Sequence, residues 1–196
     1  MKNLFAELGR SVVATILFAV ILCGLYPLIV YGAAQWLFPH QANGSLLVDK
    51  SAVRGSALLA QNFTGAKYFH PRPSAAGANG FDATSSGGSN SGPTSSNLVA
   101  NITQNIATYR SDNGLTSNTP VPADAVTASA SGLDPDISPA NAELQIPRVA
   151  RARGISEDRV RVLVKQNTRG RDLGVFGEPR VNVTTLNFAL DSLAGK

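Results

Sequence analysis

Glycine and hydroxyl side chains are most concentrated in the sequence SSGGSNSGPTSSN, which runs from Ser85 to Asn97. A loop of this composition could bind a phosphate group through its backbone N–H groups. The phosphate-binding loop of nucleotide hydrolases, however, has the pattern GxxxxGK[ST] after an apolar strand. Here no lysine follows the glycines, no apolar strand precedes them, and Pro93 has no N–H to offer. The stretch is therefore interpreted as a turn-rich surface loop rather than a nucleotide site.

The side chains that hydrolytic enzymes and metal sites use are sparse. The chain has two histidines, His40 and His70, a single cysteine, Cys23, and no GxSxG nucleophile motif. Two distant histidines do not make a metal-ligand cluster. Asp134 and Asp136, in the sequence GLDPDIS, could bind a cation, although aspartate beside proline is also ordinary turn chemistry. We predict no catalytic residue, no metal site and no intrinsic cofactor.

An apolar segment near the N-terminus precedes the rest of the chain and determines where it lies relative to a membrane. No Asp, Glu, Lys or Arg occurs between Ser11 and Val48, and the most apolar part runs from Val12 to Ala34. A helix of this length, at ~1.5 Å per residue, is ~35 Å long and exceeds the ~30 Å hydrocarbon core of a bilayer. We expect a signal-anchor helix at residues 12–36, preceded by a short cytoplasmic segment at 1–11. One soluble domain is expected at 37–196.

A cleaved signal peptide is the alternative for this segment. Lys2 and Arg10 form a basic start, and the small residues at 32–34 resemble a weak cleavage site. The apolar region of such peptides is usually ~7–15 residues long, which is shorter than the segment found here.

The charges that flank the apolar segment predict its orientation. Lys2 and Arg10 precede it, and the first basic residue after it is Lys50. Basic residues favour the cytoplasmic side of a membrane. We therefore expect a single-pass protein of the bacterial inner membrane, with its N-terminus in the cytoplasm and its soluble domain in the periplasm. A domain in that compartment is not expected to bind nucleic acid, and with Cys23 in the anchor it folds without disulfides.

The elements of the soluble domain follow from periodicity and capping residues. Helices are predicted from Leu98 to Gly114, from Pro139 to Gly154 with a bend at Pro147, from Ser156 to about Gly170, and from Thr184 onward. Strands are predicted at 46–48, 57–60, around 126 and at 180–183, and a long loop at 64–94. Strands and helices do not alternate regularly, which predicts an α+β fold.

Basic residues are also concentrated between Arg148 and Arg171, where eight Lys and Arg occur against only Glu157 and Asp158. Two interpretations fit this run. It is either the exposed face of two helices or a patch that docks an acidic partner or anionic ligand.

Six motifs in a fixed order carry a resemblance to a known family. They are QANGSLL, VRGSALLAQNFTGAKYFHPRPSAAG, SGGSNSGPTS, VTASASGLDPDIS, QIPRVARARG and GEPRVNVTTLNFALDSL. Together with the length and the single N-terminal apolar segment, they resemble the C subunit of the Kdp-type potassium-transporting ATPase. The resemblance covers nearly the whole chain.

The resemblance implies an accessory, non-transporting subunit of an ATP-driven potassium uptake pump. In this family a potassium-channel-like subunit and a P-type ATPase subunit are separate chains, and the C subunit is needed for the assembled, active complex. A catalytic-chaperone role that raises the ATP affinity of the ATPase subunit is also implied. ATP would then be bound through that subunit, with Gln145 as the nucleotide-contact candidate, because amides can pair with an adenine edge. The alternative for Gln145 is a helix-surface amide beside Pro147.

The resemblance also points to surfaces that contact partner subunits. Tyr68, Phe69 and Arg72, in YFHPRPSA, are residue types enriched at interface hot spots, and His70 lies among them. The Gly/Ser loop is then a family signature that shapes such a contact, with the candidates Ser86, Gly87, Gly88, Ser89 and Asn90.

Three functions follow as alternatives. A periplasmic domain is separated from cytoplasmic ATP, which favours a stabilising or entrance-shaping role on the outer face of the channel-like subunit. A nucleotide-binding regulator would instead need a cytoplasmic domain and binding that depends on Gln145. A stand-alone, membrane-anchored enzyme or binding domain of the cell envelope would need activity that depends on His70.

Overall fold

The computed structural model describes residues 2–49 and 51–194, and the chain divides into two compact units, residues 1–46 and residues 47–196. Lys50, the first basic residue after the apolar segment, lies outside the described residues.

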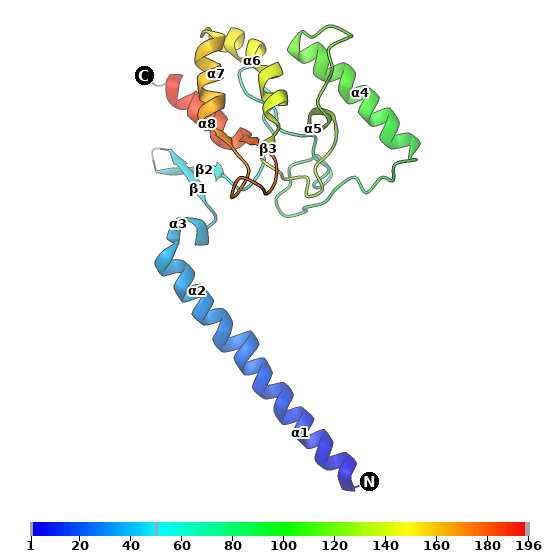
Figure 1. Ribbon diagram of the computed structural model, residues 1–196, viewed down its shortest axis with the longest axis vertical. Helices are drawn as coiled ribbons and strands as arrows, with labels where there is room; N and C mark the ends of the chain where they lie inside the picture. The colour runs from blue at the N-terminus through cyan, green and yellow to red at the C-terminus, as the bar shows by residue number, and fades with distance from the viewer. Residues whose placement is uncertain (1, 50, 195–196) are drawn as a thin grey trace. The chain divides into compact units, whose positions relative to one another are not determined.

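The first unit is a long apolar helix (Figure 1). It consists of α1 (Lys2–Ala19), the π-helical turn η1 (Val20–Leu25) and α2 (Tyr26–Leu37), and a short α3 (Pro39–Ala42) follows. Asn3–Leu37 is long and apolar enough to cross a membrane, with a mean hydropathy of 2.6 in its most apolar stretch, none of which is buried. Apolar side chains exposed on every side are stable only in an apolar medium. The helix is therefore a candidate for a membrane span.

A π-helical turn marks the proline in this helix. Pro27 has no N–H, and its ring crowds the carbonyl group four residues earlier. The wider turn of η1 ends just before it and moves that carbonyl out of the α-helical position. The long helix can therefore continue through the proline to Leu37.

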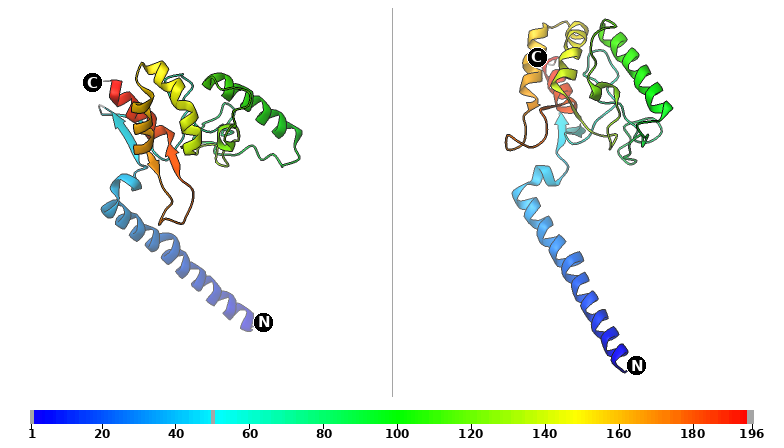
Figure 2. Two further views of the ribbon diagram at one scale, coloured as in Figure 1. Left: turned by 45° about the horizontal axis from the view of Figure 1, so that its top comes forward. Right: turned by 45° about the vertical axis from the view of Figure 1, so that its right-hand side comes forward.

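The second unit is a mixed domain of helices and two small sheets (Figures 1 and 2). Its longer helices are α4 (Ser96–Asn113), α6 (Pro139–Arg153), α7 (Glu157–Gln166) and α8 (Val183–Ala194), with a single turn at α5 (Ala123–Val126). A hairpin of β1 (Leu46–Asp49) and β2 (Ala52–Ser56) forms one sheet. The other is antiparallel, in the order β3 (Asp136–Ile137), β5 (Arg180–Asn182), β4 (Thr168–Arg169). The predicted α+β class is confirmed.

Serine caps begin three of the helices, and glycines end two of them. Ser138 Oγ accepts a hydrogen bond from the N–H of Asn141 at 3.1 Å, and Ser95 and Ser156 cap α4 and α7 in the same way. α4 and α6 end at Gly114 and Gly154, which adopt left-handed φ angles of 64° and 66°. The predictions for α4 and α6 are therefore confirmed close to their ends.

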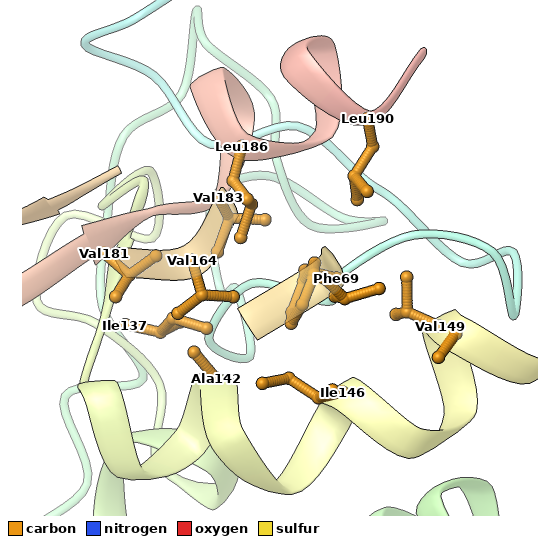
Figure 3. Close-up of a cluster of buried hydrophobic side chains, with 12 residues drawn as sticks. Phe69, Ile137, Ala142, Ile146, Val149, Val164, Val181, Val183, Leu186 and Leu190 are labelled. Carbon is orange, nitrogen blue, oxygen red and sulfur yellow. The ribbon is translucent and has the colours of Figure 1, made fainter. Parts of the chain in front are cut away.

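The hydrophobic core lies between α6, α7, α8 and the three-stranded sheet (Figure 3). Ile146 and Val149 reach it from α6, and Leu186 and Leu190 from α8, all with at most 1% of their surface exposed. Phe69 lies among them, although it belongs to the long loop between β2 and α4. The loop is thus anchored in the core by one aromatic side chain.

Two predicted strands are wrong. Residues 57–60 form a turn, because Ser56 Oγ accepts the N–H of Leu58 at 3.0 Å and the Ser56 carbonyl accepts that of Leu59 at 3.3 Å. Val126 lies at the end of the helical turn α5, where its carbonyl accepts a hydrogen bond from Asn105 of α4. In both places local hydrogen bonds override the apolar run.

Two predicted boundaries shift. α7 ends at Gln166 rather than near Gly170, because β4 begins at Thr168 to pair with β5. The final strand stops at Asn182, whose side-chain oxygen accepts the N–H of Thr185 at 2.9 Å and so caps the start of α8.

Candidate functional site

A stripe of polar side chains runs along one face of α6. Asn141, Gln145 and Arg148 are spaced by four and three residues, which places them above one another on a helix. All three are buried, with exposed fractions of 1%, 1% and 8%. Buried polar groups are costly unless they are hydrogen-bonded, so the partners of this stripe define what the helix holds in place.

Gln145 uses its full hydrogen-bonding capacity inside the protein. Its Oε1 accepts bonds from the N–H of His70 and from Nη2 of Arg148, both at 2.7 Å. Its Nε2 donates to the carbonyl oxygen of His70 at 3.1 Å and to Oδ1 of Asn141 at 2.9 Å. An amide has two donor and two acceptor positions, and all four are occupied. The interpretation of Gln145 as a helix-surface amide is therefore wrong.

Asn187 of α8 binds the backbone of Phe69, the residue before His70, in the same way. Its Oδ1 accepts the N–H of Phe69 at 2.8 Å, and its Nδ2 donates to the carbonyl oxygen of Phe69 at 2.8 Å. The two amides thus satisfy all four backbone polar groups of Phe69 and His70 from two different helices. We call Gln145, Asn187 and the backbone they hold the amide clamp. It replaces the strand partners that an extended segment would otherwise need.

Arg148 binds the residues just before Phe69 in the same segment. Its Nη1 donates to the carbonyl oxygens of Ala66 and Tyr68, each at 2.8 Å, and its Nε donates to Oδ1 of Asn113 on α4 at 2.9 Å. None of these partners is a carboxylate, and burial lowers the pKa of Arg148. Carbonyl and amide oxygens therefore solvate this buried cation.

Asn141 extends the network to α4 and α5. Its Oδ1 accepts the hydroxyl of Tyr109 at 2.8 Å, and its Nδ2 donates to Asp124 at 3.0 Å. Asp124 also accepts from the N–H and hydroxyl of Ser138 at 2.8 and 2.9 Å. Burial raises the pKa of Tyr109, so its hydroxyl keeps its proton and acts as a donor.

The six residues from Tyr68 to Pro73 differ in burial, and so in how accessible they are to a partner subunit. Phe69 is fully buried, and its side chain faces the core in this structure. Tyr68 is half-buried, and its hydroxyl donates to Asp191 at 3.0 Å, below the guanidinium of Arg153 at 5.1 Å from the ring. Arg72 is half-buried and pairs with Asp134 at 3.2 Å. Of these hot-spot candidates, Arg72 shares a groove with Ser86 of the Gly/Ser loop.

The Gly/Ser loop packs on the turn at residues 129–134. The N–H of Gly87 and the hydroxyl of Ser86 both donate to the carbonyl oxygen of Ser131 at 2.9 Å. A Cβ on Gly88 would lie 2.9 Å from the Ala130 carbonyl oxygen, and one on Gly132, at φ +68°, would lie 2.6 Å from that of Gly87. The glycines are thus required for close backbone contact.

A groove of about 660 Å³ joins the two sequence motifs. Arg72 lines it together with Ser86, and Leu58 and Leu59 form its apolar wall. Leu58 exposes 60% of its surface. Ser89 and Asn90 are exposed beyond the groove. The structure therefore brings Arg72 and the Gly/Ser loop together, and it separates Phe69 and Gln145 from them.

The predicted carboxylate pair is used for structure. Asp134 Oδ1 accepts the N–H of Asp136 at 3.0 Å, which is the expected turn, and Asp136 pairs with Arg180 at 3.3 Å. Burial raises the pKa of Asp136, and the charge of Asp134 adds to this. Among the described residues no group of three His, Cys, Asp or Glu could hold a metal ion.

The basic run between residues 148 and 171 is divided among several roles. Arg148 lies inside the domain, and Arg153 pairs with Asp191 at 2.8 Å. Arg161 pairs with Glu143 at 2.9 Å and Arg171 with Glu178 at 2.8 Å. Of the eight basic residues in this run, Arg153, Arg161 and Arg171 are thus matched by acidic residues of the same chain.

Sequence reasoning missed the buried, structural roles of Asn141, Arg148 and Asn187. The signal for the first two was present, since a polar stripe at helical spacing interrupts the apolar face of α6. Asn187 carried no such signal, because its partner Phe69 is 118 residues away in the sequence.

Comparisons with known proteins agree with one another. The family model described as "K+-transporting ATPase, c chain" matches residues 8–192. The potassium-transporting ATPase KdpC subunit of Gemmatimonas aurantiaca is 58% identical over 170 residues, or 87% of this chain and 84% of the relative. That of Nitratidesulfovibrio vulgaris is 53% identical over 186 residues, or 95% and 94%. That of Mycobacterium tuberculosis is 53% identical over 187 residues, or 95% and 98%.

Replacing Gln145 by alanine is expected to destabilise the domain by about 2–5 kcal/mol, because it leaves several buried polar groups without partners. Urea unfolding of the full-length chain in mild detergent, followed by circular dichroism, measures this. Gln104 of α4 is exposed, so Gln104→Ala is the matched control and should change stability by no more than about 0.5 kcal/mol. Equal effects of the two substitutions would contradict the role of the amide clamp.

His70 is expected to make stability depend on pH. Burial, and then the charge of Arg148 with Nη1 3.3 Å from Nε2, lower the pKa of His70 below 6.5 in the folded state. The unfolded chain then binds the proton more readily, so stability is lost as pH falls through about 6.5. Unfolding at about pH 7.5 and about pH 5.5 should show a larger loss for the wild type than for His70→Asn. A loss of the same size in both would exclude His70 as its source.

Proposed function

We propose that this chain, which belongs to the KdpC family of K⁺-transporting ATPase c chains, holds the potassium pump together by docking its outer loops on another pump subunit. It is an accessory subunit of a potassium pump by its family membership. The observation that carries the docking role is the groove between Arg72 and the Gly/Ser loop, where a rigid support presents polar and apolar groups at the surface.

Rigidity is what makes this surface suitable for docking. The amide clamp fixes Phe69 and His70, and the prolines at 71 and 73 restrict the chain that leads to Arg72. On the other side, Gly88 and Gly132 allow the Gly/Ser loop to lie against the turn at 129–134. Both halves of the groove are ordered before a partner arrives, which reduces the entropy lost on binding.

Arg72 is the proposed centre of the contact. It is half-buried, its Nε has no partner among the described residues, and Asp134 holds its other end. The guanidinium is partly exposed in the groove, where an oxygen atom of a partner can form a charge-assisted hydrogen bond with it. Arginine in such a site is typical of binding hot spots. The partners we propose are the other subunits of the pump, with the P-type ATPase chain among them.

Direct adenine recognition by Gln145 is not part of this proposal. Its amide would have to give up four hydrogen bonds, two of which hold His70 in place. An ATP-dependent role of the subunit would therefore act through the ATPase chain, without a nucleotide contact from Gln145.

We further propose that residues 12–36 span the bacterial inner membrane as a signal-anchor and that the domain at 37–196 faces the periplasm. The support is the exposed apolar helix Asn3–Leu37 and the basic residues Lys2 and Arg10, which precede residues 12–36. Trp36, with 83% of its surface exposed, lies where an aromatic side chain would contact the lipid headgroups.

Ser89→Trp is expected to weaken assembly without unfolding the domain, because Ser89 is an exposed residue of the Gly/Ser loop. The tagged full-length chain is purified from its native membrane in mild detergent, and all co-eluting proteins are identified. The wild type should recover a P-type ATPase and further pump subunits, and the variant about tenfold less, which corresponds to about 1.4 kcal/mol.

Val162→Trp on α7 is the matched control, since Val162 is exposed and lies outside the loop. Its recovery should equal that of the wild type. Recovery of the wild-type chain alone, from cells taking up potassium, would overturn the assembly role. Undiminished recovery with Ser89→Trp would overturn the docking surface only.

Thiol labelling tests the orientation separately. Cys23 is the single cysteine, so Cys23→Ser gives a background in which Val162→Cys or Asn3→Cys is the only thiol. A reagent that does not cross the inner membrane should label Val162→Cys in intact cells and Asn3→Cys only after lysis. The reverse pattern would place the domain in the cytoplasm. Loss of the Asn3→Cys segment from the mature chain would identify a cleaved signal peptide.

A further inference from the structure

The hairpin that joins β4 and β5 ends in an exposed apolar tip. Leu173, Val175 and Phe176 expose 90%, 67% and 64% of their surface. Single exposed apolar residues are common on protein surfaces, but three within four residues at one tip form a distinct feature. None of them packs on the core of the domain.

The tip has a defined backbone structure. The N–H of Asp172 donates to the carbonyl oxygen of Phe176 at 2.8 Å, and the N–H of Phe176 donates back to that of Asp172 at 2.9 Å. Leu173 adopts a left-handed φ of 52° and Gly174 one of 78°, which turns the chain tightly. The backbone groups of the tip thus bond to one another, and the apolar side chains are held outward.

Charged residues form a collar behind the tip. Arg171 pairs with Glu178 through two hydrogen bonds of 2.9 and 2.8 Å, and Arg180 pairs with Asp172 at 3.3 Å. Further back, Arg169 is exposed and has no ion-pair partner within 4.0 Å among the described residues. The hairpin therefore changes from apolar at its apex to charged, with an excess of arginine, at its base.

The sequence of an apolar apex followed by a charged base matches the layers of a lipid interface. Acyl chains accept apolar side chains, and the phosphate layer above them accepts arginines. A stable protein interface buries about 800 Å² on each partner, and an apex of three apolar side chains is too small to supply such an area.

Chain connectivity keeps the second unit near the membrane surface. Nine residues, 38–46, lie between Leu37, the end of α2, and Leu47, the first residue of the second unit. Such a linker reaches at most about 35 Å when fully extended, and α3 shortens it. Within the second unit, the hairpin projects at the end where β1 begins (Figures 1 and 2, orange-brown).

We propose that the β4–β5 tip inserts Leu173, Val175 and Phe176 into the interfacial layer of the bilayer that the N-terminal helix spans. The inference rests on the membrane anchor proposed above. The tip acts as a second attachment point, and it restrains the rotation of the domain about its linker. That restraint presents the groove at Arg72 to the pump subunits in a fixed orientation.

Tryptophan fluorescence in reconstituted vesicles tests this contact. Trp36 is the single tryptophan, so Trp36→Phe with Phe176→Trp places the only reporter at the tip. The full-length chain is reconstituted without other subunits into vesicles of neutral and anionic phospholipids, with bromine on the acyl chains as quencher. The tip reporter should lose most of its emission, and adding Leu173→Asp should restore it.

Trp36→Phe with Val162→Trp is the matched control and should keep its emission, because Val162 lies on α7 and is exposed there. An unquenched tip reporter would overturn the inference. So would a tip reporter that is shielded from aqueous iodide only when the other pump subunits are present, since the tip would then dock on protein.

The unmodified chain separates this inference from the anchor on which it rests. Trp36 itself should be quenched by the same lipids if the N-terminal helix spans the bilayer. Quenching of Trp36 without quenching at the tip would leave the anchor in place and reject the hairpin contact. An unquenched Trp36 would reject the anchor itself, and with it the basis of the inference.

Discussion

The domain depends on two side-chain amides that take the place of β-strand neighbours. Gln145 and Asn187 satisfy the backbone N–H and C=O groups of two consecutive residues that belong to no sheet. Without them, four polar groups would be buried unpaired in a core that also holds the ring of Phe69, at a cost of about 1–3 kcal/mol each. The clamp therefore allows an irregular segment to cross the interior between α6 and α8.

The same network separates the structural residues of the family motifs from those free to bind. Gln145, Arg148 and Phe69 are turned inward and committed to one another. Arg72, Ser86 and the residues that follow reach the surface beside a groove. A motif such as YFHPRPSA thus has an inner half that fixes its position and an outer half that can meet a partner.

Sequence alone predicted the elements that depend on local chemistry. α4 and α6 begin at capping serines and end at left-handed glycines, and both signals are readable from the printed sequence. The partners of Gln145 and Asn187 were not predictable, since they lie 75 and 118 residues away and carry no periodicity of their own. The strand predicted at 57–60 was wrong for a different reason, because the hydroxyl and carbonyl groups of Ser56 accept local hydrogen bonds that form a turn in place of the strand.

The separation in sequence between the halves of the clamp sets an order of events in synthesis. Phe69 is made early, but it stays without its backbone partners until Asn187, 118 residues later, has left the ribosome. Long-range contacts of this kind form late and slowly. A nascent chain would therefore remain open through most of its translation, which is the condition in which a polypeptide can be threaded through a narrow export channel.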